Sequence, residues 1–210
     1  IKDLIQHRLD SSNPVEFVSK SKIPTHYGEF TGHVYKDTVD NTEHIALTFG
    51  DYLDSEDTMV RVHSECLTGD TLFSSKCDCG SQLSNALNTI SKNGSGVLLY
   101  MRGHEGRGIG LGNKIKAYSL QDEGDDTVDA NLKLGFKNDQ RDYGTGALIL
   151  RSLGIEKMNL LTNNPSKRAG LEGYGLSITK RTSLLGKTTP ENEKYLETKE
   201  SKMGHVFNEE

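Results

Sequence analysis

The three cysteines of this 210-residue chain all fall within one short segment, RVHSECLTGDTLFSSKCDCGSQL, as Cys66, Cys77 and Cys79. Three clustered thiols with none elsewhere indicate a metal site rather than a disulfide framework. A structural zinc is normally closed by four protein ligands, whereas a catalytic zinc keeps one position open. Three cysteines therefore favour an open zinc site that activates water. We expect Cys77 and Cys79 to lie on an extended segment with both thiols on one face, and Cys66 to approach from a neighbouring segment.

Two alternatives remain open from the residues alone. His63, His104 or Glu65 as a fourth ligand would make the zinc purely structural. The three cysteines would also serve as small apolar core residues without any metal.

Composition limits the class of protein. A length of 210 residues suits one compact domain with a sizeable core. We find no long apolar run and no signal-peptide pattern, and thiolate ligands need a reducing compartment, so we expect a cytoplasmic protein. The net charge of −5 argues against general nucleic-acid binding. Cations nevertheless gather in the central third of the chain, at Arg61, Arg102, Arg107, Lys114, Lys116 and Arg141.

Strands and helices alternate through the middle of the chain. Segments 44–51, 59–65, 96–101, 158–162 and 176–184 have the apolar content typical of strands. Helical spacing or helix-terminating residues predict helices at 81–92, 111–122, 126–134, 147–153 and 190–203. We predict an α/β fold, a mixed sheet flanked by helices with an antiparallel N-terminal part, in a single compact domain. The charged last helix is interpreted as a solvated one.

A glycine-rich loop, RGHEGRGIGLGNK, lies between a predicted strand and a predicted helix. Backbone N–H groups in this setting hold phosphate. The glycines do not form a convincing dinucleotide fingerprint. Arg102, His104 and Arg107, interleaved with them, suit a triphosphate.

Five blocks together resemble the GTP cyclohydrolase II family of riboflavin biosynthesis. They are the cysteine segment, RGHEGRGIGLGNKIKAYSLQD, DQRDYGTGALILRSLG, LLTNNPSK and YLETKESKMGH. The resemblance covers residues 26–205, leaving 1–25 as an unassigned N-terminal extension and 206–210 as a tail. It implies a fold of the GTP cyclohydrolase II type.

The resemblance implies hydrolysis of GTP to formate, pyrophosphate and 2,5-diamino-6-ribosylamino-4(3H)-pyrimidinone 5′-phosphate. It implies one catalytic Zn²⁺ per subunit and Mg²⁺ on the triphosphate. A zinc-bound water with a pKa near ~7 suits the attack at C8 of guanine. Three thiolates weaken the Lewis acidity of zinc, so we expect nearby groups to help. A partial cyclohydrolase that stops at the formamide and a non-catalytic GTP-binding module are the alternatives.

Catalytic roles also follow from the resemblance. Tyr118 matches a tyrosine placed near the ring-opening chemistry. Arg141 matches a proposed nucleophile on the α-phosphate, and Asp139 its proposed proton acceptor. Because a guanidinium with a pKa above ~12 is a poor nucleophile, we favour Arg141 as a clamp on the transition state.

Substrate contacts carried over by position are Arg61, Val62, His63, Ser64, Glu65, Gln82, Glu105, Gly106, Arg107, Thr127, Thr162 and Lys167. Among them, Glu105 is our candidate for reading guanine, with Glu65 as second choice. Lys167 is expected to hold phosphate.

Relatives often carry a fused dihydroxybutanone-phosphate synthase domain. A chain of this length has no room for one, so we expect a monofunctional protein. The family implies a homodimer. From the net charge and the absence of a long apolar run we expect no nucleic-acid or membrane partner.

Overall fold

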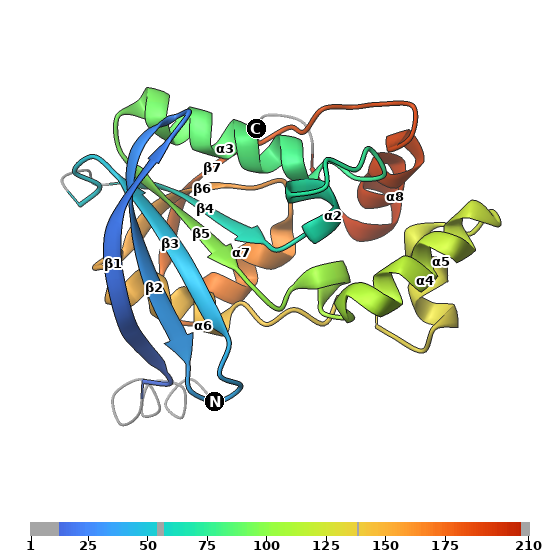
Figure 1. Cartoon of the computed structure of the whole chain (residues 1–210), viewed down its shortest axis with the longest axis horizontal. Coiled ribbons are helices and arrows are strands. Elements are labelled where there is room, and N and C mark those ends of the chain that lie inside the picture. Colours follow the sequence, from blue (N-terminus) through green and yellow to red (C-terminus); the bar gives the residue numbers. More distant parts are fainter. Residues whose placement is uncertain (1–12, 54–56, 138, 207–210) are drawn as a thin grey trace.

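The apolar runs of the sequence form the central strands of a mixed sheet. The computed structural model describes residues 13–53, 57–137 and 139–206. Within these ranges the sheet has seven strands in the order β1-β2-β3-β5-β4-β6-β7 (Figure 1). The strands are β1 (Val15–Thr25), β2 (Gly28–Asp37), β3 (Glu43–Phe49), β4 (Thr58–Ser64), β5 (Gly96–Met101), β6 (Lys157–Leu161) and β7 (Ser177–Thr182).

The sheet has an antiparallel half and a parallel half, as the sequence predicted. Neighbours from β1 through β3 to β5 run antiparallel. Strand β4 pairs in parallel with both β5 and β6, and β6 pairs in parallel with β7. The run GVLLYM forms β5, which lies between β3 and β4 and is buried along almost its whole length. A strand covered on both faces is apolar throughout rather than alternating.

The first two strands were not predicted. Strand β1 pairs with β2 along its length, from Val15 opposite Asp37 to Thr25 opposite Gly28. It lies at the edge of the sheet with most side chains exposed, so its sequence lacks the alternation that identifies a half-buried strand. Residues 15–25 of the unassigned extension therefore belong to the sheet. Positions 1–12 of that extension and 207–210 of the tail lie outside the described residues.

The predicted helices are present, with shifts of a few residues at their ends. The helices are α2 (Leu67–Asp70), α3 (Cys79–Asn93), α4 (Gly110–Asp122), α5 (Thr127–Lys133), α6 (Gly144–Ser152), α7 (Pro165–Glu172) and α8 (Glu193–Met203), with a 3-10 turn η1 (Glu105–Arg107). The Asp126 carboxylate caps α5 by accepting hydrogen bonds from the N–H groups of Val128 and Asp129 at 2.8 and 3.0 Å. No helix among the described residues has the length and apolar content to cross a membrane.

Apolar clusters cover both faces of the sheet. On one face Ala147, Ile149 and Leu150 of α6 and Leu171 of α7 pack with the central strands. On the other face Ala86 and Ile90 of α3 pack with Phe30 and Leu98. Figure 1 shows α3 on one side of the sheet, while α4, α5 and α8 gather beyond one end of it.

The predicted functional residues gather at the end of the sheet that faces α4 and α8. Strands β4, β5 and β6 are parallel, and each ends where a predicted functional segment begins: Glu65-Cys66 after β4, Arg102–Arg107 after β5 and Thr162–Lys167 after β6. Ligands of open α/β sheets bind outside the carboxyl ends of such strands.

Candidate active site

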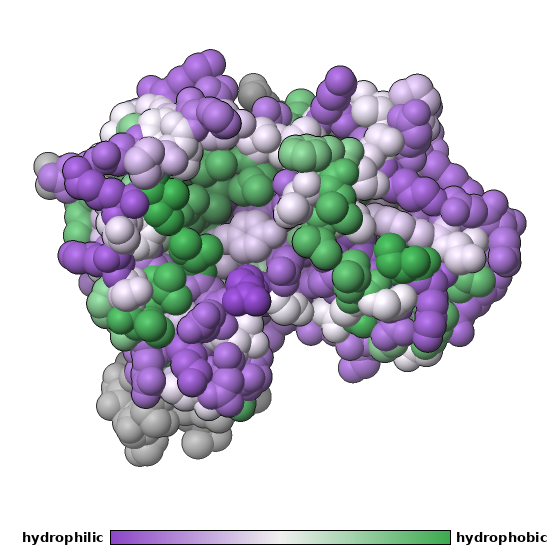
Figure 2. Space-filling view, viewed as in Figure 1, coloured by the Kyte–Doolittle hydropathy of each residue, from purple (hydrophilic) through white to green (hydrophobic). Residues whose placement is uncertain are grey.

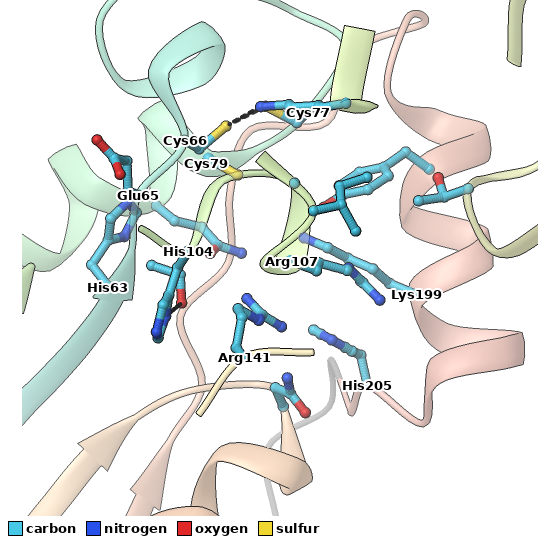
Figure 3. A pocket seen from close by; sticks show the side chains of 18 of the residues that line it. His63, Glu65, Cys66, Cys77, Cys79, His104, Arg107, Arg141, Lys199 and His205 are labelled. Carbon is cyan, nitrogen blue, oxygen red and sulfur yellow. Dashed lines mark hydrogen bonds between the residues drawn. The ribbon is translucent and has the colours of Figure 1, made fainter. Parts of the chain in front are cut away.

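Three cysteine thiols meet at the carboxyl end of β4. Their sulfur atoms all lie within 4.8 Å of one another, and Cys66 Sγ is 3.7 Å from Cys77 Sγ. A tetrahedral zinc with Zn–S bonds of about 2.3 Å separates its sulfur ligands by about 3.8 Å, so this spacing fits a bound zinc. The cluster lies at the top of Figure 3.

The backbone delivers the thiols differently from our expectation. Cys66 is the N-cap of α2, Cys77 lies in a bend and Cys79 is the first residue of α3. Cys77 and Cys79 therefore do not lie on an extended segment. Asp78 between them is the N-cap residue of α3 and is buried, with only 1% of its surface exposed. The convergence comes from two helix starts rather than from the period of a strand.

Gly69 makes room for the cluster. A Cβ atom at this position would lie 2.7 Å from Cys77 Sγ and 3.2 Å from Cys66 Sγ. Both distances are shorter than ordinary van der Waals contact, so a side chain here would displace the thiols. The glycine thus shapes a space for three sulfur atoms and the ion between them.

The residues considered as a fourth ligand do not join the thiol cluster. His63 Nε2 lies 3.1 Å from both carboxylate oxygens of Asp70, and His104 Nδ1 lies 3.2 Å from Ser64 Oγ. Glu65 accepts a hydrogen bond from the N–H of Gly103 at 2.8 Å. Among the described residues, the group of clustered metal-ligating side chains consists of the three cysteines. A metal held by them keeps a coordination position open.

The pKa values of the thiols favour a thiolate that could bind a cation. Hydrogen bonds from Cys77 and Cys79, together with the ammonium of Lys114, hold the pKa of Cys66 well below its usual range. The hydrogen bond with Cys66, and burial, raise the pKa of Cys77 to about 11. The Cys66 thiolate thus accepts hydrogen bonds from the neighbouring thiols. A divalent cation replaces the protons of those thiols.

The cysteines line a pocket in which basic side chains converge. Arg107, Arg141, Lys167 and Lys199 border it. His205 borders it as well, but burial lowers its pKa to about 3, so it is neutral. In Figure 3 the side chains of Arg141 and His205 lie below the cysteines, with Lys199 to one side. Arg102 and Lys116, two of the cations noted in the sequence, are exposed instead. A pocket combining a metal site with converging cations suits a polyanionic substrate.

Arg141 is held by Asp139. Its Nε donates to Asp139 Oδ1 at 2.8 Å and its backbone N–H to the same oxygen at 3.1 Å, while its Nη2 donates to the other oxygen. Burial acts to raise the pKa of Asp139, but the hydrogen bonds and charge of Arg141 outweigh it and leave that pKa lowered. Arg141 lines the pocket, whereas Asp139 is not among the lining residues. The carboxylate thus fixes the orientation of the guanidinium.

Arg107 approaches the pocket through a strained turn. Gly106, Arg107 and Gly108 all have positive φ angles, of 59°, 69° and 89°. A non-glycine residue in this region costs about 1–3 kcal/mol and is characteristic of functional sites. A Cβ at Gly106 would lie 2.8 Å from Ile109 Cγ1, so the turn also needs glycine for space. The glycine-rich loop therefore presents an arginine to the pocket.

Lys167 is a buried lysine beside two arginines. Its Nζ donates to the backbone carbonyl of Val62 at 3.0 Å. Burial, followed by the charges of Arg61 and Arg141, lowers its pKa well below the usual value. An anion in the pocket would relieve this repulsion, so the site favours a negatively charged ligand.

A hydrogen-bonded chain joins the floor of the pocket to the last helix. Arg61 Nη2 donates to Gln82 Oε1 at 2.8 Å, and Gln82 Nε2 donates to Asp78 Oδ2 at 2.7 Å. The other oxygen of Asp78 accepts from Lys199 Nζ of α8 at 2.5 Å. The last helix was predicted to be solvated, but Thr198 and Lys199 are buried. That prediction was wrong because one lysine faces an acidic partner in the interior.

Glu105 contacts Lys114 and the start of α2 rather than lining the pocket. Its Oε2 accepts from the N–H of Leu67 at 2.6 Å, and its Oε1 accepts from Lys114 Nζ at 2.6 Å and from the N–H of Gly106 at 3.2 Å. Both oxygens therefore already accept hydrogen bonds from protein groups. The role of Glu105 in reading guanine stays a prediction.

Tyr118 lines the pocket from α4. Lys76 Nζ and Lys114 Nζ lie 5.2 and 5.6 Å from the centre of its ring. Burial raises its pKa, so the phenol keeps its proton. The neutral hydroxyl shares a hydrogen bond with Thr68.

Most of the predicted site residues come together in this pocket. The lining includes Arg61, His63, Ser64, Glu65, Cys66, Cys77, Cys79, Gln82, Gly106, Arg107, Tyr118, Thr127, Arg141, Thr162 and Lys167. Val62, Glu105 and Asp139 are absent from the lining and act on it through Lys167, Lys114 and Arg141.

Several lining residues were not among the predicted site residues. They include Gln121 and Asn131 from the α4–α5 pair and Tyr195, Lys199 and His205 from the C-terminal segment. Asn131 is only 3% exposed. These polar residues occur in segments with helical patterns, where polar side chains usually face solvent. The sequence alone did not show that they are buried.

The fold and site define a class: an α/β protein with a three-thiol cluster, suited to a metal ion, that opens into a pocket with converging basic side chains at the carboxyl ends of parallel strands. The family model for GTP cyclohydrolase II matches residues 16–183. The chain belongs to the GTP cyclohydrolase II family.

Relatives share this sequence along nearly its whole length. The chain is 54% identical to the riboflavin biosynthesis protein RibBA of Salinispora tropica over 207 residues, which is 99% of this chain and 52% of that protein. It is 55% identical to the probable monofunctional riboflavin biosynthesis protein RIBA 3, chloroplastic, of Oryza sativa, covering 99% of this chain and 39% of that protein. The chain therefore spans about half the length, or less, of these curated relatives.

A solved structure shares the fold. RibBX from A. baumannii, described as a two domain 3,4-dihydroxy-2-butanone 4-phosphate synthase, aligns with a TM-score of 0.52 at 26% identity. The alignment covers 86% of this chain and 44% of that one.

Proposed function

We propose that this chain hydrolyses GTP, opens the imidazole ring at C8 and releases formate and pyrophosphate. The remaining product is 2,5-diamino-6-ribosylamino-4(3H)-pyrimidinone 5′-phosphate, formed in the first step of riboflavin biosynthesis. The observation that carries the proposal is the three-thiol cluster opening into a pocket that also holds Arg107, Arg141 and Lys167. Membership of the GTP cyclohydrolase II family supports it.

The metal proposed for the three thiols is zinc. Clustered soft thiolates with near-tetrahedral spacing suit Zn²⁺. When bound, zinc supplies a Lewis acid that lowers the pKa of water. Magnesium is proposed to accompany the triphosphate, because hard cations bind through phosphate oxygens.

The roles of the side chains follow from their positions. Arg107, Arg141 and Lys167 hold the phosphates, and Asp139 orients Arg141 so that its fork stabilises charge that develops at the α-phosphate. Tyr118, with a raised pKa, positions the attacking water as a hydrogen-bond donor or acceptor. A homodimer located in the cytoplasm is proposed as the working form.

The test is product analysis by mass spectrometry after incubation of the zinc-loaded protein with GTP and magnesium. Formate, pyrophosphate and the diaminopyrimidine monophosphate together are the expected result. A formylated product at the end of the reaction would indicate a partial cyclohydrolase. Unchanged GTP from protein with verified zinc content would overturn the proposal. The Cys79→Ser variant serves as the control for metal-independent hydrolysis.

A further inference from the structure

Lys114 contacts a metal-ligating thiol from inside the protein. Its Nζ lies 3.0 Å from Cys66 Sγ, 2.7 Å from Thr68 Oγ1 and 2.6 Å from Glu105 Oε1. The residue is only 7% exposed. All three donors of the ammonium are therefore directed at fixed acceptors, one of which is a sulfur atom of the cluster.

Helix α4 carries this lysine in place of an apolar residue. Leu111 and Ile115 on the same helix are 41% and 50% exposed, whereas Lys114 is buried. Figure 2 shows apolar surface in the region of α2 and α4. A helix normally buries its leucine and isoleucine side chains and exposes its lysines. The reversed arrangement indicates that the ammonium is needed in the interior.

Charge explains what the ammonium does there. Three thiolates around a divalent zinc would carry one net negative charge. The Lys114 ammonium, which is ion-paired to Glu105, donates a charged hydrogen bond to one of these sulfurs. Glu105 fixes the ammonium, and it accepts from Leu67 at the start of α2 and from Gly106 in the glycine-rich loop. Lys114 and Glu105 together thus connect α4, the start of α2 and the glycine-rich loop.

We infer that Lys114 is a positioning residue that acts on the metal through Cys66. It orients the Cys66 thiolate and withdraws electron density from it, so the metal becomes a stronger Lewis acid than three free thiolates would allow. Partners of metal ligands typically change metal affinity or activity by about 10–100-fold. This inference rests on the metal site of the proposed function.

The experiment measures the metal, not only turnover. Zinc affinity is determined by competition with a chromogenic chelator for wild type, Lys114→Met, Lys114→Gln and Lys114→Arg. Absorption spectra of the cobalt(II)-substituted proteins report on the sulfur-to-metal charge transfer. Lys116→Met, two positions further along α4 at an exposed site, is the matched control.

We expect Lys114→Met and Lys114→Gln to bind zinc about 10–100-fold more weakly, because the Cys66 thiolate loses the group that orients it and offsets its charge, and this outweighs the stronger electron donation of the free thiolate. Their cobalt charge-transfer band should shift to longer wavelength, because a thiolate without its charged donor gives up electrons more easily. Lys114→Arg should recover part of both effects, and Lys116→Met should match wild type. If Lys114→Met fails to fold, Lys114→Gln provides the comparison.

Wild-type affinity and an unshifted cobalt spectrum in the folded, uncharged variants would overturn the inference. Neither readout requires GTP. If the wild-type protein releases no formate while the metal effects appear, the proposed function fails and the role of Lys114 stands.

Discussion

Lys199 and Asp78 form a buried ion pair that joins α8 to the segment between Cys77 and Cys79. The Nζ of Lys199 lies 2.5 Å from Asp78 Oδ1, across 121 residues of sequence. Their side chains are 6% and 1% exposed. Because Asp78 stands between Cys77 and Cys79, the pair couples the position of α8 to the geometry of the thiols.

Removal of Lys199 should destabilise the protein. The Lys199→Met variant removes the charged partner of the buried Asp78 carboxylate and keeps the hydrogen bond from Gln82, and breaking a buried pair in this way costs about 3–5 kcal/mol. Urea unfolding measures the loss, and Glu200→Gln, an exposed charge change on the same helix, is the control. The double variant with Asp78→Asn should lose less than the sum of the single changes. A loss in Lys199→Met no larger than that of the control would contradict the role of the pair.

Each cysteine should be necessary for the metal. Replacing Cys66, Cys77 or Cys79 by serine removes one of three ligands, so metal content measured by elemental analysis should fall well below one ion per chain. Formate release should be lost with it. Removal of the metal from wild type with a chelator should abolish activity, and zinc should restore it. Full activity in metal-free protein would exclude the metal site from the reaction.

Substitution of Arg141 distinguishes its two proposed roles, a clamp on the transition state and a nucleophile on the α-phosphate. Arg141→Lys keeps the charge but loses the planar fork held by Asp139, so pyrophosphate release should fall by about 10²–10³-fold without vanishing. Asp139→Asn should act in the same direction by loosening Arg141. Intact-mass measurement of acid-quenched wild type should show no guanylyl adduct. An adduct that disappears in Arg141→Lys would instead identify Arg141 as the nucleophile.

Much of the architecture could be predicted because its signals are local. The apolar run of β5, the Asp126 cap of α5 and the spacing within α3 depend on neighbours in sequence, and the structure confirms them. Strand β1 could not be predicted because an exposed edge strand is stabilised by backbone pairing with β2, which leaves no apolar pattern.

The site was predictable where the residue type itself is unusual. Three cysteines close in sequence predict a metal site without any knowledge of the backbone. The structure brings the three thiols together, although the predicted extended conformation was wrong. Lys199 belongs to a charged helix that resembles any solvated one. Its burial depends on Asp78, and a contact between residues so far apart in sequence leaves no periodic signal.

Acid should destabilise the protein partly through His104. Burial, followed by the charges of Arg141 and Lys167, lowers the pKa of His104 to about 4 from the usual 6.5. Between these values the unfolded chain binds a proton that the folded chain excludes, so the free energy of unfolding falls as the pH drops from 6.5 to 4. The shift corresponds to at most about 3 kcal/mol.

Urea unfolding of wild type and His104→Gln at several pH values in this window tests the prediction. The variant should show a flatter dependence, whereas His26→Gln, at an exposed position, should follow wild type. Identical slopes in wild type and His104→Gln would show that His104 takes up its proton equally in both states.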